Sequence, residues 1–119
     1  MATKYKGEKS SLVEKASGLT AADVFGAVGS DNVAKKIVED DIGKANASGI
    51  SNIINAYDPD LITIGGSVAL NNPELTLNPI NKYLKDYAIN KLPKIMISPL
   101  GKDVVISGAV AYVLDSTKK

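Results

Sequence analysis

Apolar residues recur every three or four positions over residues 33–57, and this period predicts one long helix. Ser30 or Asp31, directly before it, can cap the start of that helix with a side-chain oxygen. Pro59 ends it, because the residue before a proline avoids the helical conformation. We therefore expect a helix over about residues 32–56.

Two glycines, Gly43 and Gly49, fall inside this predicted helix. Each costs about 1 kcal/mol of helix stability relative to alanine, because glycine loses more backbone entropy on folding. A glycine also removes the side chain that would keep a neighbouring element at a distance. We expect both glycines to allow close packing against another helix or a sheet.

Three shorter helices are predicted around the long one. The first covers about residues 20–29, where Thr20 and Asp23 have the spacing of a capping box. Another begins at Pro79, since proline is favourable at the first helical position. The last is capped by Asp103 and carries apolar residues along one face, although the two valines that follow the cap also suit a strand.

Two short apolar runs predict strands. Residues 61–64 are rich in β-branched side chains, with only Thr63 polar, and suit a strand that is buried on both faces. Residues 94–98 form the second run. Strands that alternate with helices indicate an α/β domain with a parallel element. Because two strands make a thin sheet, we expect the domain to be incomplete or to be completed by another chain.

The composition excludes several classes of function. The 119 residues suit one domain, 45% of them are hydrophobic, and a net charge of +1 gives no argument for a nucleic-acid partner. Without cysteine or histidine, the chain has no thiolate or imidazole for zinc and no such group for a catalytic pair. The acidic run over residues 39–41 suits a solvated helix face, so we expect no metal ligands.

The two ends of the chain differ in character. Residues 1–11 are polar and rich in lysine, without the apolar stretch of a secretory signal, and we expect them to be a flexible leader. Residues 12–119 are expected to form a single α/β domain. No apolar run approaches the ~20 residues of a membrane span, so we expect a cytoplasmic protein with no membrane partner.

Three stretches resemble the C-terminal part of ROK-family sugar kinases (repressor, open reading frame, kinase). They are "NIINAYDPDLITIGGSVA" at 52–69, "ISPLG" at 97–101 and "SGAVAYVL" at 107–114. The first stretch is long and specific, the others follow in the family's order, and the glucokinase-like members are the most similar. The resemblance implies the C-terminal lobe of the actin-like ATPase (ribonuclease H-like) fold, present in part.

The resemblance also implies ATP with Mg²⁺ in the cleft between two lobes. The glycine pair after the first strand is similar to the family's adenosine motif, which implies that Gly65, Gly66 and Ser67 contact the nucleotide. Glycines at the end of a strand let the backbone approach a ligand without a Cβ in the way. From the spacing alone, the pair also fits a plain turn from strand to helix.

Gly101 and Glu14 are two further candidates that the resemblance suggests. Gly101, in "SPLGKD", would lie beside the same cleft, although an ordinary proline–glycine turn explains it better. Family members have a glutamate before "ASG" that contacts sugar hydroxyls, which implies that Glu14 binds a sugar. Glu14 is one residue closer to Gly18 than in the family pattern, and a solvated surface glutamate is the alternative.

Several features of the family are not found in this sequence. It has no "DxGxT" phosphate loop, no catalytic aspartate in an "N-D" pair and no cysteine-rich zinc loop. Phosphoryl transfer depends on positioning, on Mg²⁺ and on a catalytic base. We therefore expect no catalytic residue in this chain and no self-sufficient phosphoryl transfer.

Three interpretations follow from the resemblance. The chain is expected to be a C-terminal kinase fragment with an ATP-binding wall, either a folded remnant or, slightly less favoured, a half that works with a separate N-terminal lobe. The alternative is a non-catalytic interaction or regulatory module that keeps the kinase scaffold. Because the fragment would expose an apolar face, we expect a homo-oligomer or the missing N-terminal kinase lobe to cover it.

Overall fold

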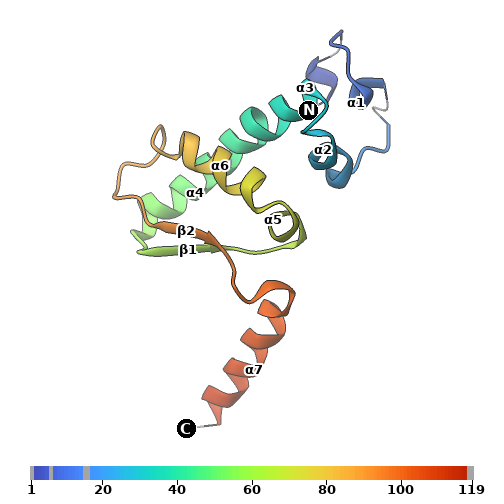
Figure 1. Cartoon of the computed structure of the whole chain (residues 1–119). Helices are drawn as coiled ribbons and strands as arrows, with labels where there is room; N and C mark the ends of the chain where they lie inside the picture. Colours follow the sequence, from blue (N-terminus) through green and yellow to red (C-terminus); the bar gives the residue numbers. More distant parts are fainter. Residues whose placement is uncertain (1, 6, 15–16, 118–119) are drawn as a thin grey trace.

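The computed structural model describes residues 2–5, 7–14 and 17–117 and shows a mixed α/β arrangement with one small parallel sheet (Figure 1). In chain order the elements are η1 (Ala2–Tyr5), α1 (Ser11–Glu14), α2 (Ala21–Ala27), α3 (Asn32–Lys36), η2 (Ile37–Ile42), α4 (Gly43–Tyr57), β1 (Leu61–Ile64), α5 (Ser67–Asn71), α6 (Pro73–Leu84), β2 (Lys94–Ile97), η3 (Gly101–Asp103) and α7 (Val104–Ser116).

The predicted helix caps are present at α2 and α3 but not at α7, where Asp103 makes no side-chain cap hydrogen bond. The Thr20 hydroxyl accepts from the backbone N–H of Asp23, and the Asp23 carboxylate accepts from the backbone N–H of Thr20, which completes a capping box. At α3, the carboxylate of Asp31 accepts from the backbone N–H groups of Val33 and Ala34, at 2.8 and 3.2 Å. Both starts are therefore fixed by local side-chain chemistry, as the sequence predicts.

The long helix is also present, with one feature that its period did not indicate. α3, η2 and α4 follow one another without a break, but η2 over Ile37–Ile42 is a π-helix. The helix ends at Asp58, which adopts the left-handed conformation with φ of +45°. Since Pro59 follows, Asp58 cannot easily remain in the right-handed helical region, and the chain turns into β1.

The sheet consists of β1 and β2 in parallel, with Leu61 opposite Lys94 and Ile64 opposite Ile97. α4 and α6 cover one of its faces (Figure 1). The expectation that β1 is buried on both faces is therefore wrong: Leu61 is 51% exposed and Thr63 is exposed, whereas Ile62 is half-buried. An apolar strand with one open face is normally completed by further structure.

The core lies where α4 and α6 pack together, and Ile54, Ile80 and Leu84 are among its fully buried side chains. Gly43 permits this approach, since a Cβ there would be 2.5 Å from the Cβ of Pro79. The same expectation is wrong for Gly49, where a Cβ would meet nothing within 4 Å.

Pro79 does not begin a helix as the sequence suggested. α6 begins six residues earlier, with Pro73 at the first helical position, and Pro79 lies inside it. A proline inside a helix loses one backbone hydrogen bond. Here Pro79 is buried and packs against Gly43.

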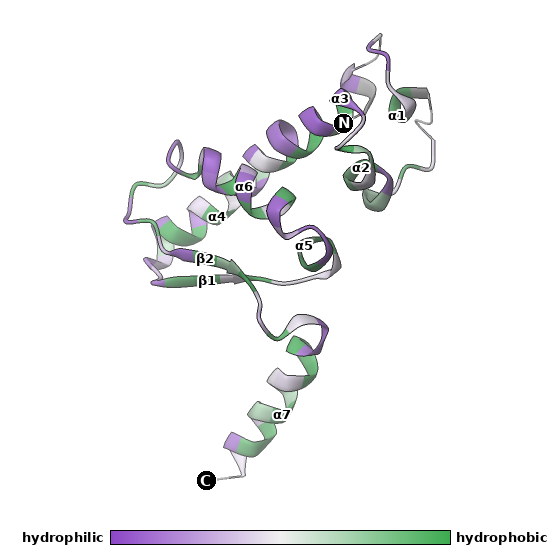
Figure 2. Ribbon diagram, viewed as in Figure 1, coloured by the Kyte–Doolittle hydropathy of each residue, from purple (hydrophilic) through white to green (hydrophobic). Residues whose placement is uncertain are grey.

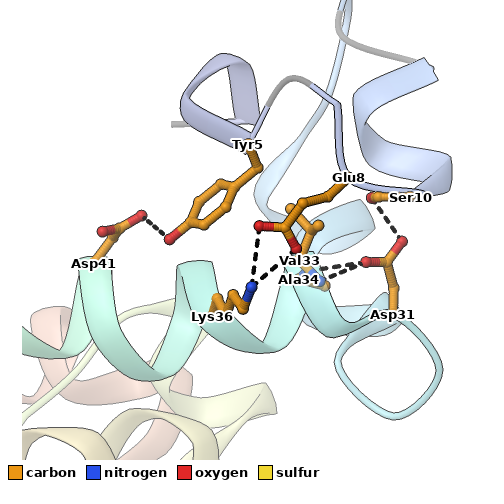
Figure 3. A network of polar contacts seen from close by, with 8 residues as sticks. All are labelled: Tyr5, Glu8, Ser10, Asp31, Val33, Ala34, Lys36 and Asp41. Atoms are coloured by element: carbon orange, nitrogen blue, oxygen red, sulfur yellow. Dashed lines mark hydrogen bonds and ion pairs between the residues drawn. The ribbon is translucent and has the colours of Figure 1, made fainter.

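The N-terminal segment that we expected to be a flexible leader contacts the long helix (Figure 3). Tyr5 donates its hydroxyl to the Asp41 carboxylate at 2.9 Å, and Lys36 donates to the Glu8 carboxylate at 2.9 and 3.0 Å. The Ser10 hydroxyl donates to Asp31 at 2.8 Å. The mobility of this segment stays a prediction, and Met1 and Lys6 lie outside the described residues.

The last helix, α7, runs away from the rest of the molecule (Figure 1). None of its residues is buried, and it is apolar over most of its length before the polar end at Asp115 and Ser116 (Figure 2). The molecule is consequently elongated, with a radius of gyration of 17.5 Å. Within residues 2–5, 7–14 and 17–117, no helix has the length and hydropathy that a bilayer crossing requires.

Candidate functional site

A cavity of about 450 Å³ lies where the end of β1 passes into α5. The helices α2, η2, α4 and α6 complete its walls. The lining residues are Ala21 and Phe25 of α2, Val38 and Ile42 of η2, Gly43 and Asn46 of α4, residues 64–69, and Leu75, Thr76 and Pro79 of α6. The cavity thus contains all three residues of the predicted nucleotide wall, Gly65, Gly66 and Ser67.

The two glycines of this wall differ in whether their backbone conformation requires glycine. Gly66 has φ of +97°, a conformation that residues with a side chain rarely adopt, and it turns the chain from β1 into α5. Gly65 has no positive φ, and a Cβ there would meet nothing within 4 Å. Neither turn geometry nor packing therefore explains why residue 65 is a glycine. Its backbone is open to the cavity.

The chemistry of the lining is apolar and uncharged. Among the residues that the structure describes, none with a charged side chain lines the cavity, and the polar side chains in its lining are Asn46, Ser67 and Thr76. The Thr76 hydroxyl donates to the backbone carbonyl of Asn72 at 2.8 Å. Within the described residues, the side chains of Asn46 and Ser67 have no hydrogen-bond partner, so both are available to a ligand.

Such a cavity suits one part of a nucleotide better than another. A planar base or a ribose fits apolar walls with a few polar groups. A triphosphate carries several negative charges and needs cations or many N–H donors. The lining is therefore chemically suited to a nucleoside rather than to a chain of phosphate groups.

Of the other two predicted site residues, Gly101 is not among those that line this cavity. Gly101 has φ of +57° and begins η3, in the turn between β2 and α7, where its N–H donates to the Ser98 carbonyl at 3.3 Å. Glu14 is the last residue of α1, and its side chain lies outside the described part of the chain. The structure thus brings Gly65, Gly66 and Ser67 together without Gly101, and the prediction for Glu14 stays a prediction.

Phe25 and Asn46 are cavity residues that the sequence analysis did not select. Phe25 is the single phenylalanine of the chain and is buried in α2. Asn46 lies three residues after Gly43, so both fall on one face of α4. That spacing was a usable signal, but nothing in the sequence alone showed that this face of the helix meets the glycine pair.

The acidic run over residues 39–41 is held by cations and hydroxyl groups from several elements. Asp40 accepts from the Tyr83 hydroxyl, which is the main cause of its lowered pKa, and Lys82 lies 3.6 Å away. Asp41 accepts from Lys4 at 2.7 Å and from Tyr5, and these contacts lower its pKa too. Over the described ranges, no three side chains of metal-binding type gather into one group.

Comparison with known proteins assigns the chain to a family. The sequence profile of the ROK family matches residues 4–116. The chain belongs to the ROK family. The resemblance stated from the sequence is therefore confirmed, and with it a mixed α/β member of the actin-like ATPase superfamily.

Three curated relatives in this family are named glucokinase. Identity is 39% over 67 residues to the protein of Pyrobaculum calidifontis, covering 56% of this chain and 23% of the relative. The identity to the protein of Aeropyrum pernix is 36% over 95 residues, covering 77% of this chain and 29% of the relative. The identity to the protein of Halalkalibacterium halodurans is 32% over 110 residues, covering 89% of this chain and 33% of the relative. The chain thus spans about a quarter to a third of the length of these ROK relatives.

Proposed function

We propose that this chain is the C-terminal part of a glucokinase-like ROK sugar kinase, in which Gly65, Gly66 and Ser67 hold the adenosine half of ATP. The observation that carries the proposal is the uncharged cavity around these residues, with an open backbone at Gly65 and unpaired side chains at Asn46 and Ser67. Membership of the ROK family and similarity to proteins named glucokinase support it.

In this proposal, the chain binds and orients the nucleotide but does not transfer its phosphate alone. The backbone at Gly65 lies against the base or ribose, and Asn46 and Ser67 supply hydrogen bonds to it. Mg²⁺ and the phosphates are held, and the sugar hydroxyl is deprotonated, by groups of an N-terminal kinase lobe. The relatives, which are three to four times as long as the matched segments, have room for such a lobe.

The test is a titration of the ¹⁵N-labelled chain, followed by backbone amide shifts. We expect MgATP to shift the amides of residues 65–67 together with those of Asn46 and its neighbours. Adenosine should shift the same amides, because the cavity is uncharged, whereas inorganic tripolyphosphate should not. An absence of shifts at millimolar MgATP, or shifts only elsewhere, would contradict the proposal.

A second candidate function is a non-catalytic interaction module that keeps the kinase scaffold. The exposed apolar surface of α7 favours it, since such a surface is typical of a protein-binding element. The two candidates are separated by the same titration, because an interaction module does not require nucleotide binding at Gly65.

A further inference from the structure

The π-helix η2 forms part of the wall of the candidate cavity. The backbone N–H of Gly43 donates to the carbonyl of Val38, five residues back, whereas an α-helix would use the carbonyl of Glu39. Gly43 and Val38 both line the cavity, and so does Ile42. A π-helical turn is rare and often lies at a functional site. η2 is therefore a local irregularity at the place where we expect the nucleotide to bind.

The N-terminal segment contacts the long helix on the N-terminal side of this turn. We name the contacting residues of that segment the strap: Lys4, Tyr5, Glu8 and Ser10. The Glu8 carboxylate accepts from Lys36 of α3 (Figure 3). The Ser10 hydroxyl donates to Asp31 at the start of α3. The strap is thus attached to the part of the long helix that precedes η2.

A second attachment of the strap lies within η2 itself. Lys4 and Tyr5 both donate to the carboxylate of Asp41, at 2.7 and 2.9 Å. The ring of Tyr5 also lies within cation–π reach of α3, since the Nζ of Lys36 is 5.8 Å from its centre. The strap therefore ties η2 to α3 and limits how far one can turn against the other.

Conversion of η2 into an α-helix would turn its two sides against each other. A π-helical turn holds one residue more than an α-helical turn, so its removal rotates one side by about 100°, the angle of a single residue. α4 is packed against α6 at Gly43 and Pro79, and Asp40 accepts from Tyr83 of α6. The part that moves is consequently α3 together with α2, which contacts it and carries Phe25 of the cavity wall.

We propose that the strap holds η2 in its π-helical form and thereby sets the shape of the nucleotide cavity. With the strap attached, the N–H of Gly43 bonds to Val38, and Phe25 completes the wall. When the strap is released, this N–H passes to the carbonyl of Glu39, and α2 turns away with Phe25. The device rests on the proposed function, because it would regulate nucleotide binding. By reciprocity, a bound nucleotide favours the attached strap to the same extent.

The contacts of the strap are weak enough to open. Its ion pairs lie at the surface, where the side chains of Lys4 and Lys36 are 65% and 49% exposed. Pairs of this kind contribute little stability each, and salt weakens them further. The released state is therefore within reach as a minor population, which a switch between two conformations requires.

The experiment compares the full chain with two strap variants and one control. Asp41→Ala removes the acceptor, and Tyr5→Phe removes one donor without changing the sequence of the long helix. Glu39→Ala is the matched control, since it also truncates a carboxylate side chain in η2. The partner of Glu39 is Lys35, 3.9 Å away on the same helix, so this substitution leaves the strap attached. Far-UV circular dichroism checks that all of the variants are folded.

The first measurement needs no ligand. In the isotope-labelled chain, the NMR coupling across a hydrogen bond identifies the carbonyl that accepts from the N–H of Gly43. We expect this carbonyl to be that of Val38 in the unmodified chain and in Glu39→Ala. Coupling to the carbonyl of residue 39 should appear in Asp41→Ala and, more weakly, in Tyr5→Phe. The ring resonances of Phe25, the single phenylalanine, should shift in the same two variants.

The second measurement is the affinity for adenosine, followed by amide shifts. It should fall about 5-fold in Asp41→Ala and less in Tyr5→Phe, and it should stay unchanged in Glu39→Ala. If the unmodified chain does not bind adenosine, the proposed function is wrong. The hydrogen bond of Gly43 and the resonances of Phe25 then still decide whether the strap controls η2 and the cavity wall.

Four results would overturn the proposal. The first is an unmodified chain in which the N–H of Gly43 bonds to the carbonyl of residue 39. The second is a bond to Val38 that survives in both strap variants. The third is a change of this bond without a shift of the Phe25 ring. The fourth is an equal response of Glu39→Ala, which would indicate a general effect of the lost charge rather than release of the strap.

Discussion

Gly43 on α4 lies so close to Pro79 on α6 that a Cβ at position 43 would be 2.5 Å from the Cβ of Pro79. Both residues also line the candidate adenosine cavity. The spacing of the two helices, and with it the depth of the cavity, therefore depends on the absence of one methyl group.

Gly43→Ala should destabilise the chain for this reason. A methyl group at 2.5 Å from a buried ring carbon forces α4 and α6 apart, and overpacking of this kind costs about 1–3 kcal/mol. The free energy of unfolding in urea, measured for both proteins, checks this expectation.

Gly49→Ala is the matched control, since it is the same substitution in the same helix. A Cβ at Gly49 meets nothing within 4 Å, so only the gain in helix propensity remains. That gain should stabilise the chain by about 0.5–1 kcal/mol. Equal effects of the two substitutions would mean that the contact of α4 with α6 is not as close as described.

Gly65→Val should weaken nucleotide binding without unfolding the chain. Gly65 has no positive φ and has open space where a Cβ would lie, so valine fits the protein but enters the cavity. We expect a stability change within about 0.5 kcal/mol. The affinity for adenosine, measured by calorimetry or amide shifts, should fall at least ~10-fold, because the base would meet two added methyl groups.

Gly29→Val provides the comparison for this variant. Gly29 also has no positive φ and has open space where a Cβ would lie, but it does not line the cavity. Its substitution should leave adenosine affinity unchanged. If both variants bind adenosine as well as the unmodified chain does, Gly65 is simply part of a turn.

Asp31→Ala should remove a helix cap and a pH-dependent contribution to stability. Burial acts to raise the pKa of Asp31, but hydrogen bonds from Ser10, Ala34 and Val33 outweigh it and hold the pKa below its usual value. A carboxyl group with a lowered folded pKa stabilises fully above its unfolded pKa of about 4. That contribution is lost as the pH falls through the folded pKa.

The loss on Asp31→Ala should be about 1–2 kcal/mol at pH 7 and should shrink in acid. Asp31→Asn separates the cap from the charge, because asparagine caps a helix about as well as aspartate but does not titrate. Urea unfolding of all three proteins between pH 2 and pH 7 measures both effects. An acid dependence that is the same in Asp31→Asn as in the unmodified chain would exclude Asp31 as its source.

Local signals predicted the elements of this fold better than their packing. Thr20 with Asp23, and Asp31, identified two helix starts, because capping depends on neighbours within three residues. Pro79 was misplaced because the sequence does not show that Gly43 would lie against it and so tolerate a proline inside α6. The spacing of the apolar residues did not indicate the π-helix over residues 37–42 either.

The same division holds for the candidate site. Gly65, Gly66 and Ser67 were selected because the stretch around them resembles the ROK family's adenosine motif, and a motif of this kind is a local pattern. Phe25 and Asn46 complete the cavity from helices that are distant in the sequence, and no spacing rule connects them with Gly65. The sequence thus predicted the part of the cavity wall that the turn from β1 to α5 forms, but not the parts that long-range packing supplies.

The parallel pairing of β1 with β2 has a consequence for the order of folding. Leu61 lies opposite Lys94, and α5 and α6 occupy the segment between them, because parallel strands cannot be joined by a tight turn. Helices form from contacts within one turn, on the microsecond scale or faster, whereas this pairing has to close a long loop first. We therefore expect the helical part to assemble early, while the small sheet determines the rate at which the chain reaches its final state.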